Sequence, residues 1–484
     1  MARPPGLPLV APLPSLTPAV ALAALEGLPH AFLLHSALEG ARGRWSFFGA
    51  DPFARFRGRR YDDAVRLWRR LAARALEGPA PFTGGVVGAW SYDFARRLER
   101  LPAVARDDLG LPDVTIAFHD VVGAIDHATG AAWLVSSGLP LEGAGRIGRA
   151  RRRLASFARR LEAAAGRGGG SDPAAARAQG VPRSTFGRDA YRAAVERVRD
   201  HIRRGDIFQA NLSQRWSVPL EPAGLPPGPT ARALFGSLAR RSPAPFAAFL
   251  DAGDHAMASA SPERFLELRG ARVETRPIKG TRPRGADPAE DAALARELSA
   301  SAKDRAENVM IVDVLRNDLG RVCATGSVRA TALCELERFP QVFHLTSTVT
   351  GELAPGIDAF DLLHACFPGG SITGAPKIRA MEIIERLEPV RRHVYTGAIG
   401  YVDWRGDADW NIAIRGALVT PDAIHCAAGG GITADSDPDA EYEETLHKAT
   451  GLAGALADLG AQVAGLLPEP TAAAAPVSPG PEPR

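Results

Sequence analysis

Apolar residues recur along the chain at two kinds of spacing, and the spacing predicts where helices and strands form. Helical spacing covers residues 61–76, 147–161 and 191–202, and Gly205 then marks a helix end. Strand-like apolar runs cover residues 114–118, 132–135, 207–216, 247–250, 265–268 and 273–277. Because the strands come in runs with helices between the runs, the pattern favours an α+β fold over a parallel βαβ sheet.

Two more helices are expected in the second half of the chain. One begins at Asp287, because Pro288 follows it and Glu290 is placed to complete a capping box. The other covers residues 303–317.

Composition divides the chain into regions. Residues 163–183 are rich in Gly and Ala, which is typical of a flexible linker. This segment separates an N-terminal region, residues 1–162, from a second region, residues 184–462, in which sequence signals are denser. Residues 463–484 are rich in Pro and Ala and are expected to form a disordered tail.

The overall composition is that of an ordinary globular protein. Hydrophobic residues make up 45% of the 484 residues, charged residues make up 23%, and the net charge is +3. The basic residues are spread along the chain, so nucleic-acid binding is not expected. No apolar stretch is long enough to cross a membrane, and prolines interrupt the apolar N-terminus, so neither a membrane span nor a signal peptide is expected. Four cysteines without a CxxC pair favour a reduced, cytoplasmic protein.

Lysine is rare in this chain, because 54 of the 58 basic residues are arginines. An arginine keeps its proton near neutral pH, whereas a lysine can lose its proton where the surroundings lower its pKa. A site that needs a neutral amine therefore cannot replace its lysine by arginine. The four lysines are Lys279, Lys303, Lys377 and Lys448.

Lys279 is the candidate nucleophile among them. Arg276, Arg282 and Arg284 lie within five residues of it, and like charges lower the pKa of a lysine. The alternative is an anion-binding loop in which Lys279 stays charged.

Two pairs of acidic residues could form a metal site. Asp304 and Glu307 are three residues apart on a predicted helix, and Glu441 and Glu444 repeat this spacing near the C-terminus. Brought together, the two pairs would offer the oxygen ligands that Mg²⁺ prefers. The alternative is two solvated helix faces with an ion pair between Glu444 and Lys448, and spacing alone favours this alternative.

A run of three glycines and one further glutamate are the remaining candidates. Gly429, Gly430 and Gly431 could let backbone N–H groups approach a carboxylate, although a plain tight turn is the simpler interpretation. Glu263 begins a predicted strand, where it fits either a general acid or the ion-pair partner of Arg264.

Six blocks of the sequence, taken in order, resemble the chorismate-utilising enzymes. This family includes the large subunits of anthranilate synthase and aminodeoxychorismate synthase, and the isochorismate and salicylate synthases. The resemblance implies an α+β fold like that of anthranilate synthase component I, with antiparallel β-sheets packed face to face and helices on the outside. The blocks are GDIFQANLSQRW (205–216), SPERFL (261–266), RPIKGTRPRG (276–285), DRAENVMIVDVLRNDLGR (304–321), FPGGSITGAPKIRAM (367–381) and GGGITADSDPDAEYEETLHKA (429–449).

The resemblance also implies residue roles. Glu307 and Glu444 would bind Mg²⁺, Asp304 and Glu441 would lie close to the metal, and the metal would hold the ring carboxylate of chorismate. This implication outweighs the interpretation as solvated helix faces. The residues implied to contact the substrate are Arg415, Tyr401, Lys448, Gly429, Gly430, Gly431, His344 and Thr373.

The N-terminal region resembles the regulatory region of the aminating members of the family over residues 33–52. In the family this region can hold tryptophan, as a feedback inhibitor or a structural ligand. Ser36, Arg44 and Ser46 match the tryptophan-binding positions loosely, so tryptophan is a possible ligand.

Two positions of the substrate site discriminate within the family. Isochorismate and salicylate synthases have a water-activating lysine where this chain has Gln209, and a neutral amide cannot act as a general base. Aminodeoxychorismate synthases carry a lysine at position 279, whereas anthranilate synthases usually carry alanine. The chain is therefore expected to aminate chorismate at C4, with Lys279 as a covalent nucleophile and Glu263 as the acid.

Ammonia is expected from a separate glutamine amidotransferase subunit. None of the four cysteines lies in the Gly-flanked nucleophile elbow that such enzymes use, and the chain has no spare length for that domain. Three alternatives stay open: an anthranilate synthase large subunit, a non-catalytic tryptophan-binding protein with the same fold, and a Schiff-base lyase that uses Lys279.

Overall fold

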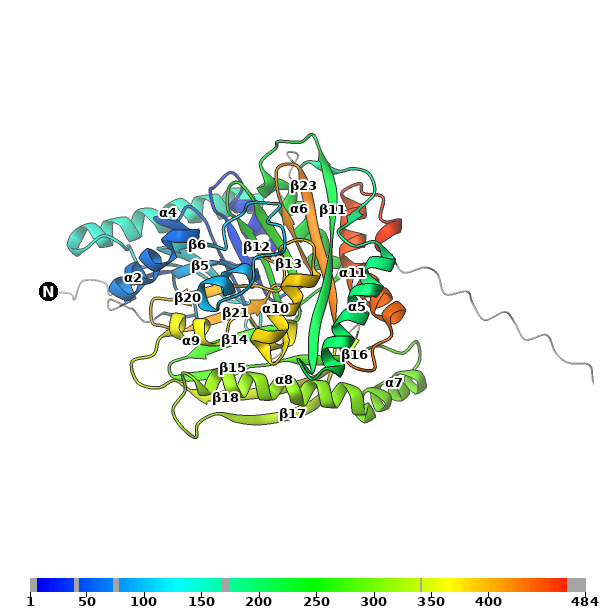
Figure 1. Cartoon of the computed structure of the whole chain (residues 1–484). Helices are drawn as coiled ribbons and strands as arrows, with labels where there is room; N and C mark the ends of the chain where they lie inside the picture. Colours follow the sequence, from blue (N-terminus) through cyan, green and yellow to red (C-terminus); the bar gives the residue numbers. More distant parts are fainter. Residues whose placement is uncertain (1–6, 39–42, 73–77, 167–174, 340–341, 468–484) are drawn as a thin grey trace, which may run out of the picture.

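Two large antiparallel β-sheets face each other, and helices cover their outer faces (Figure 1). This arrangement was obtained as a computed structural model, which describes residues 7–38, 43–72, 78–166, 175–339 and 342–467. The expected α+β fold with face-to-face antiparallel sheets is confirmed. No helix in the described ranges is long and apolar enough to cross a membrane.

The first sheet combines strands from both halves of the chain. Its order is β1 (Leu9–Leu13), β8 (Ala132–Ser136), β7 (Val121–Asp126), β3 (Trp45–Gly49), β2 (Phe32–His35), β12 (Phe246–Asp251), β13 (Ala256–Ser261), β22 (Gly416–Val419), β23 (Ala423–Ile432), β11 (Gln209–Glu221) and β10 (Arg183–Ser184). Two short strands, β9 (Arg177–Ala178) and β19 (Gly374–Ala375), also pair with β11.

The second sheet also joins both halves. Its order is β16 (Ile278–Pro283), β18 (Val342–Glu352), β15 (Arg272–Thr275), β14 (Arg264–Arg269), β21 (Ala408–Ile412), β20 (Ala398–Asp403), β5 (Gly85–Trp90), β6 (Val114–His119) and β4 (Ala54–Arg57). A further strand, β17 (Arg329–Arg338), pairs with β18.

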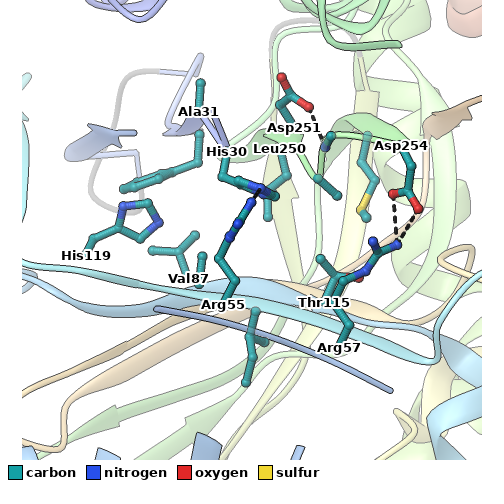
Figure 2. Close-up of a pocket in the computed structure, with 16 residues that line it drawn as sticks. His30, Ala31, Arg55, Arg57, Val87, Thr115, His119, Leu250, Asp251 and Asp254 are labelled. Atoms are coloured by element: carbon teal, nitrogen blue, oxygen red, sulfur yellow. Dashed lines mark hydrogen bonds and ion pairs between the residues drawn. The ribbon is translucent and has the colours of Figure 1, made fainter. Parts of the chain in front are cut away.

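Aromatic and aliphatic side chains from the inner faces fill the space between the sheets. Phe47 of β3 and Tyr401 of β20 come from opposite sheets and pack edge to face, with ring centroids 5.4 Å apart. Phe82 lies between them, 4.4 Å from the Tyr401 ring. Where β4 and β6 face β12 and β13, the two sheets enclose a cavity instead of a filled core (Figure 2).

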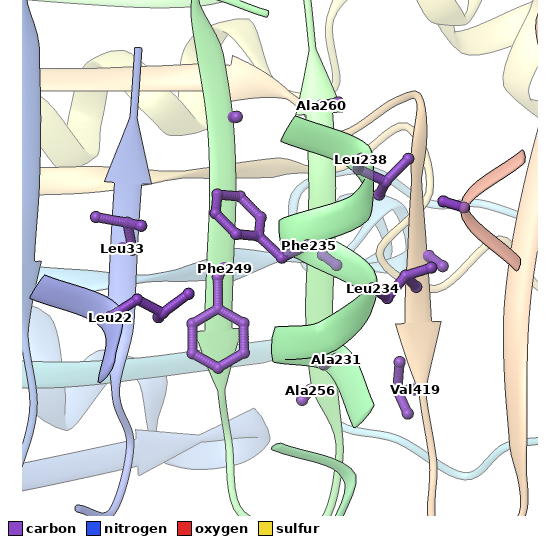
Figure 3. Close-up of a cluster of buried hydrophobic side chains, with 14 of the residues drawn as sticks. Leu22, Leu33, Ala231, Leu234, Phe235, Leu238, Phe249, Ala256, Ala260 and Val419 are labelled. Atoms are coloured by element: carbon purple, nitrogen blue, oxygen red, sulfur yellow. The ribbon is translucent and has the colours of Figure 1, made fainter. Parts of the chain in front are cut away.

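Helices bury one face each against the outside of the sheets. In α6, the side chains of Leu234, Phe235 and Leu238 lie over Phe249 of β12 and the neighbouring strand β13 (Figure 3). The helices that cover the first sheet are α1 (Pro18–Ala24), α4 (Gly143–Gly166), α6 (Pro227–Arg241) and α11 (Pro438–Asp458). Beside β11 lie α5 (Arg188–Arg203) and α10 (Lys377–Leu387). The second sheet carries α2 (Tyr61–Ala72), α3 (Ala95–Leu98), α8 (Ala302–Gly320) and α9 (Ala359–Cys366), with α7 (Pro288–Ala300) beside β16 and β18.

Most elements expected from the spacing are present, with shifted ends. The helix expected over 147–161 begins earlier, at Gly143, and continues to Gly166 as α4, and the strand expected over 207–216 continues to Glu221 as β11. Asp287 caps α7 as expected, but the capping box is not closed, because the Glu290 carboxylate accepts from the Ala286 N–H instead. For the helix expected over 61–76, residues 73–76 lie outside the described residues.

The two regions that composition indicated, residues 1–162 and 184–462, both contribute strands to each sheet. Each sheet contains one block of neighbouring strands from residues 1–162 and one block from the rest of the chain, joined edge to edge, so the division at 163–183 stays a prediction. Within that segment, α4 continues to Gly166 and β9 and β10 join β11, while residues 167–174 lie outside the described residues. In the expected tail, residues 463–467 contain the short helical turn η4 (Ala464–Leu466), and residues 468–484 lie outside the described residues.

Candidate active site

Lys279 lies on β16, at an irregularity in the pairing of this strand with β18. The register shifts between Ile278 and Thr281, and Gly280 takes a positive φ of 84°. A Cβ at Gly280 would lie 2.9 Å from the Cβ of Asp304, so only glycine lets β16 approach α8 this closely. The bulge therefore brings Lys279 and the first turns of α8 together.

The environment of Lys279 favours a neutral amine. Its Nζ donates a 2.9 Å hydrogen bond to the carbonyl oxygen of Ser371. Loss of hydration lowers the pKa of Lys279 and outweighs the nearby carboxylate of Glu307, which raises it, while the Lys448 ammonium lowers it further. The direction expected from the sequence is confirmed.

The cause expected from the sequence is wrong, because the three neighbouring arginines do not act on Lys279. Each of them forms an ion pair with a carboxylate of its own. Arg276, Arg282 and Arg284 donate to Glu337, Glu297 and Asp291 at 2.8, 2.7 and 2.6 Å, respectively. Desolvation and Lys448 lower the pKa of Lys279 instead.

Glu263 stands next to Lys279, in the tight connection between β13 and β14. The connection is held by Ser261, whose Oγ donates to the Ile412 carbonyl at 2.6 Å and accepts from the Glu263 N–H at 3.2 Å. Glu263 is only 5% exposed, and burial raises its pKa against the opposing hydrogen bond with Ser371 and the charge of Lys279. A raised pKa favours the protonated carboxyl group, which is the form that can donate a proton.

The alternative interpretation of Glu263, an ion pair with Arg264, is wrong because Arg264 has other partners. Arg264 donates to Asp409 at 3.1 Å and to Glu267 at 3.1 Å. Glu263 lies just before the first residue of β14 and has a different partner, Ser371.

The acidic residues of α8 and α11 approach each other beside Lys279. Burial is the main cause of the raised pKa of Glu307, and the nearby charge of Glu444 raises it further. Burial and the charge of Glu444 raise the pKa of Glu441 to about 7. Glu441 Oε1 accepts from Ser436 Oγ at 2.6 Å, whereas Oε2 is buried and has no hydrogen-bond partner in the described part of the chain.

Lys448 neutralises part of this negative charge. Its Nζ forms an ion pair with Glu444, as one interpretation of the sequence expected, and donates to the Gly429 carbonyl at 2.9 Å. Partial desolvation would raise the pKa of Glu444, but Lys448 outweighs it, so the pKa of Glu444 is lowered.

The acidic residues supply carboxylate oxygens, which Mg²⁺ prefers as ligands, but their side chains are not arranged around a common point. A bound Mg²⁺ would give the unpartnered Glu441 Oε2 a ligand bond and would reduce the repulsion between Glu441 and Glu444. Yet no three His, Cys, Asp or Glu side chains of the described ranges converge as in a metal site, and Asp304 is turned toward Arg282 at 3.4 Å. Mg²⁺ binding stays a prediction.

The three glycines form part of a strand, so the interpretation as a tight turn is wrong. Gly429, Gly430 and Gly431 lie in β23, paired with residues 211–213 of β11. A Cβ at Gly430 would lie 2.8 Å from Glu441 Oε2, and a Cβ at Gly431 would lie 2.1 Å from Gln209 Nε2 and 3.5 Å from Lys279 Nζ. The strand therefore needs glycine to leave room for this cluster.

Arg415 and His344 border the same cluster. Arg415, with a positive φ of 53°, donates to the Lys448 carbonyl, and burial lowers its pKa against the opposing charge of Glu444. His344 is buried, its Nδ1 lies 2.8 Å from Thr281 Oγ1, and burial and Arg415 lower its pKa to about 4. Thr373 directs its hydroxyl to the Gly369 carbonyl at 2.9 Å, so its backbone rather than its hydroxyl faces β11.

Tyr401 is the one implied substrate contact that the structure places elsewhere. Its hydroxyl accepts from Arg269 at 2.9 Å, and its ring lies between the two sheets, lining a different cavity. The tyrosine that influences Arg415 electrostatically is Tyr395, which precedes β20.

The cavity beside Tyr401 is where the predicted tryptophan-binding residues lie. Its volume is about 570 Å³, and Ser36 and Arg44 line it. Arg44 is paired with Asp126 through hydrogen bonds of 2.9 and 2.8 Å. Ser46 is not among the lining residues, because its hydroxyl is held between His35 at 2.8 Å and His127 at 2.7 Å. Tryptophan binding stays a prediction.

Three residues near the cluster were missed by sequence reasoning. Ser371 contacts both Lys279 and Glu263, although it lies in a block that was recognised. Tyr395 lies near Arg415, and Lys303 acts electrostatically on Glu307, Glu441 and Glu444. The rarity of lysine could have pointed to Lys303, because three of the four lysines surround these carboxylates.

The chain belongs to the family of chorismate binding enzymes, which matches residues 31–454. It is 43% identical over 443 residues to anthranilate synthase component 1 of Thermus thermophilus, across 88% of this chain and 92% of that protein. It is 44% identical over 370 residues to aminodeoxychorismate synthase component 1 of Klebsiella aerogenes, across 76% of each.

A solved structure agrees with the fold. Anthranilate synthase component I from Streptococcus pneumoniae has a TM-score of 0.70 and 31% identity, across 86% of this chain and 93% of that chain. The chain is therefore a chorismate-utilising enzyme, and its relatives divide between two activities at similar identity.

Proposed function

We propose that this enzyme aminates chorismate at C4, forming 4-amino-4-deoxychorismate, the precursor of p-aminobenzoate. The observation that carries the proposal is Lys279: a half-buried lysine with a lowered pKa, next to a buried carboxyl group with a raised pKa. A neutral amine beside a proton donor is the pair that a covalent displacement needs.

The proposed reaction runs in two displacements. The Lys279 nitrogen forms a bond to C2 of chorismate while the ring double bonds shift and the C4–O bond breaks. Glu263 gives its proton to the departing hydroxyl, which leaves as water, and the lysine nitrogen gives up one proton to solvent. Ammonia then forms a bond to C4 while the C2–N bond to Lys279 breaks, and one proton of the ammonia passes to the departing lysine nitrogen. Solvent returns a proton to Glu263, and the enolpyruvyl group stays in place.

Two displacements explain why nitrogen would arrive at C4. Direct attack of ammonia with loss of the C4 hydroxyl would place nitrogen at C2. An amine of the enzyme that occupies C2 first directs ammonia back to C4, so the regiochemistry depends on residue 279.

The carboxylates of α8 and α11 would serve substrate binding. Glu307 and Glu444 would hold Mg²⁺, with Glu441 and Asp304 beside it, and the bound ion would neutralise the ring carboxylate of chorismate. Arg415 and Lys448 would supply positive charge to the other carboxylate. The side chain of Gln209 lies against Gly431, and its neutral amide cannot act as a general base that activates water.

The supply of ammonia is proposed to come from a separate glutamine amidotransferase subunit in the cytoplasm. The four cysteines are buried, and burial raises the pKa of the Cys323 thiol to about 11, which is the opposite of an activated nucleophile.

The second candidate is anthranilate formation. It is favoured by the Thermus thermophilus relative, which is 43% identical over 88% of this chain. In that case Lys279 would not form a covalent bond, nitrogen would add at C2, and pyruvate would be lost.

Product analysis separates the two. The purified protein is incubated with chorismate, Mg²⁺ and ¹⁵N-ammonium at mildly alkaline pH, and products are resolved by liquid chromatography and mass spectrometry. A ¹⁵N-labelled product that retains the enolpyruvyl group, and yields p-aminobenzoate when a lyase is added, supports the proposal. Labelled anthranilate, which elutes separately from its para isomer, would establish the second candidate. Omitting ammonium controls for nitrogen from other sources.

A further inference from the structure

A second cavity lies where the edge of one sheet faces a hairpin of the other, and it shares no lining residue with the Lys279 cluster. Its volume is about 460 Å³, within the usual range for small-molecule sites. Strands β4, β5 and β6 form one wall, and β2, β12 and β13 form the other (Figure 2).

His119 is a buried residue of the cavity lining, and only one of its two ring nitrogens has a hydrogen-bond partner among the described residues. The side chain is 1% exposed, and its Nδ1 has no hydrogen-bond partner in the described part of the chain. The ring is hydrogen-bonded to the backbone of Ala50, and burial lowers the pKa of His119 to about 3. The imidazole is therefore neutral and presents a lone pair, which calls for an N–H or O–H donor.

Arg55 supplies positive charge to the same cavity. One of its Nη atoms donates to His30 Nε2 at 2.5 Å, and no carboxylate of the described residues forms an ion pair with it. A guanidinium has five N–H donors, so several stay free for an anion. Arg57, two residues further along β4, is already neutralised by Asp254 through hydrogen bonds of 2.8 and 2.6 Å.

Besides Asp254, the lining contains one carboxylate, that of Asp251, and it contacts groups other than Arg55. Asp251 Oδ1 accepts from the Gly253 N–H at 2.8 Å, and its Oδ2 faces the first turn of α6, 2.4 Å from the position of a Cβ at Gly228. The positive end of that helix stabilises it. Arg55 therefore supplies the positive charge that a bound anion could meet in this cavity.

The register of β4 and β6 sets the distance between the two groups. Arg55 lies opposite Ala117, and His119 is two residues further along the same face of β6. Diagonal neighbours of this kind have Cα atoms about 7 Å apart. The apolar part of the lining is formed by Phe32, Val87, Ala117, Leu250 and Met257.

From this arrangement we infer that the cavity is a binding site for a small, flat, ring-containing carboxylate that carries an O–H or N–H donor at the end opposite its carboxylate. The carboxylate binds Arg55, the donor binds His119 Nδ1, and the ring lies between the apolar walls. Such a ligand bridges the two sheets at a place remote in sequence from Lys279.

Titration calorimetry on the full chain tests the inference, with 4-hydroxybenzoate as probe. Because a charge-assisted contact is lost, Arg55→Gln should weaken binding about tenfold or more. Arg59→Gln, which removes another exposed arginine that does not line the cavity, should bind as the unchanged protein does. Benzoate and 4-methoxybenzoate, which lack the donor, should bind several-fold more weakly than 4-hydroxybenzoate.

Three results would overturn the inference. The first is equal affinity of the unchanged protein and Arg55→Gln, which would place any bound 4-hydroxybenzoate elsewhere, including the chorismate site. The second is no binding at millimolar probe. The third is inorganic phosphate binding as tightly as 4-hydroxybenzoate, which would make the cavity a general oxyanion site. Circular dichroism of both variants checks that they fold.

Discussion

Lys448 Nζ donates a 2.9 Å hydrogen bond to the carbonyl oxygen of Gly429, which ties helix α11 to the glycine-rich strand β23. The same ammonium pairs with Glu444 and lowers the pKa of that carboxyl group. One side chain thus connects the strand, the helix and the charge state of a proposed metal ligand.

Replacing Lys448 should therefore change the pH dependence of the enzyme. In Lys448→Gln the pKa of Glu444 rises, so the ionised carboxylate is reached only at higher pH, and the acidic limb of kcat/KM moves upward. Lys448→Arg keeps the charge and should keep the limb near its original position. Steady-state rates between pH 5 and 9 make the comparison, and an unmoved limb in Lys448→Gln would show that Glu444 does not control it.

Two substitutions of Lys279 separate its possible roles. Lys279→Ala should lower formation of the C4-aminated product by about 100-fold or more, since the nucleophile is gone, and product with nitrogen at C2 should become detectable. Lys279→Arg should fail equally, because a guanidinium cannot become neutral near pH 8. If Lys279 only binds an anion, the arginine variant would retain most of the activity, and mass spectrometry of the products would reveal it.

The raised pKa of Glu441 makes stability depend on pH. Because the folded protein binds this proton more tightly than the unfolded chain, the stabilising contribution is complete below about pH 4.5 and is lost as the pH rises to about 7. The shift corresponds to at most about 3 kcal/mol. In the presence of EDTA, Glu441→Gln should therefore lose less stability than the unchanged protein between pH 5 and 8, measured by thermal unfolding.

Mg²⁺ gives this measurement a second use. A cation at the carboxylates lowers their pKa values, so added Mg²⁺ should reduce the loss of stability of the unchanged protein toward pH 8. It should have little effect on the pH dependence of Glu307→Gln, which lacks a proposed ligand. Equal effects of Mg²⁺ on both proteins would argue against a metal site at this cluster.

A methyl group added at Gly431 should disturb the site more than the fold. The Cβ would lie 2.1 Å from Gln209 Nε2 and 3.5 Å from Lys279 Nζ, so Gln209 must move beside the proposed nucleophile. Gly431→Ala should lower kcat/KM by about tenfold or more while far-UV circular dichroism is unchanged. Gly236→Ala is a matched control, because its Cβ would meet only Arg240 Nη1 at 3.6 Å and alanine favours the helix α6. Equal activity of the two variants would show that the close approach has no catalytic value.

The sequence was informative where a property is local and less so where it depends on tertiary contacts. The blocks of residues identified Lys279, Glu263 and the carboxylates of α8 and α11, and the spacing predicted most of the elements that carry them. The cause of the lowered Lys279 pKa was missed, because the partners of Arg276 and Arg282 lie 61 and 15 residues further along the chain.

The two tyrosines illustrate the same limit. Tyr395 and Tyr401 are six residues apart, yet Tyr401 points into the space between the sheets and Tyr395 lies near Arg415. Which tyrosine approaches Arg415 depends on where β20 begins and which face of the sheet it turns inward. A one-residue shift in register exchanges the two faces, so spacing alone could not decide.

The pairing of β2 with β12 has a consequence for dividing the chain. Four residue pairs, including Leu33 with Phe249, join the N-terminal strands to the rest of the first sheet, and β5 completes the second sheet beside β20. A fragment beginning at residue 184 would expose the hydrogen-bonding edges of both β12 and β20, with apolar side chains on either side of them. Such a fragment would recruit strands from other molecules and precipitate, whereas co-expressed halves could complete each other by strand addition and form a nicked but soluble enzyme.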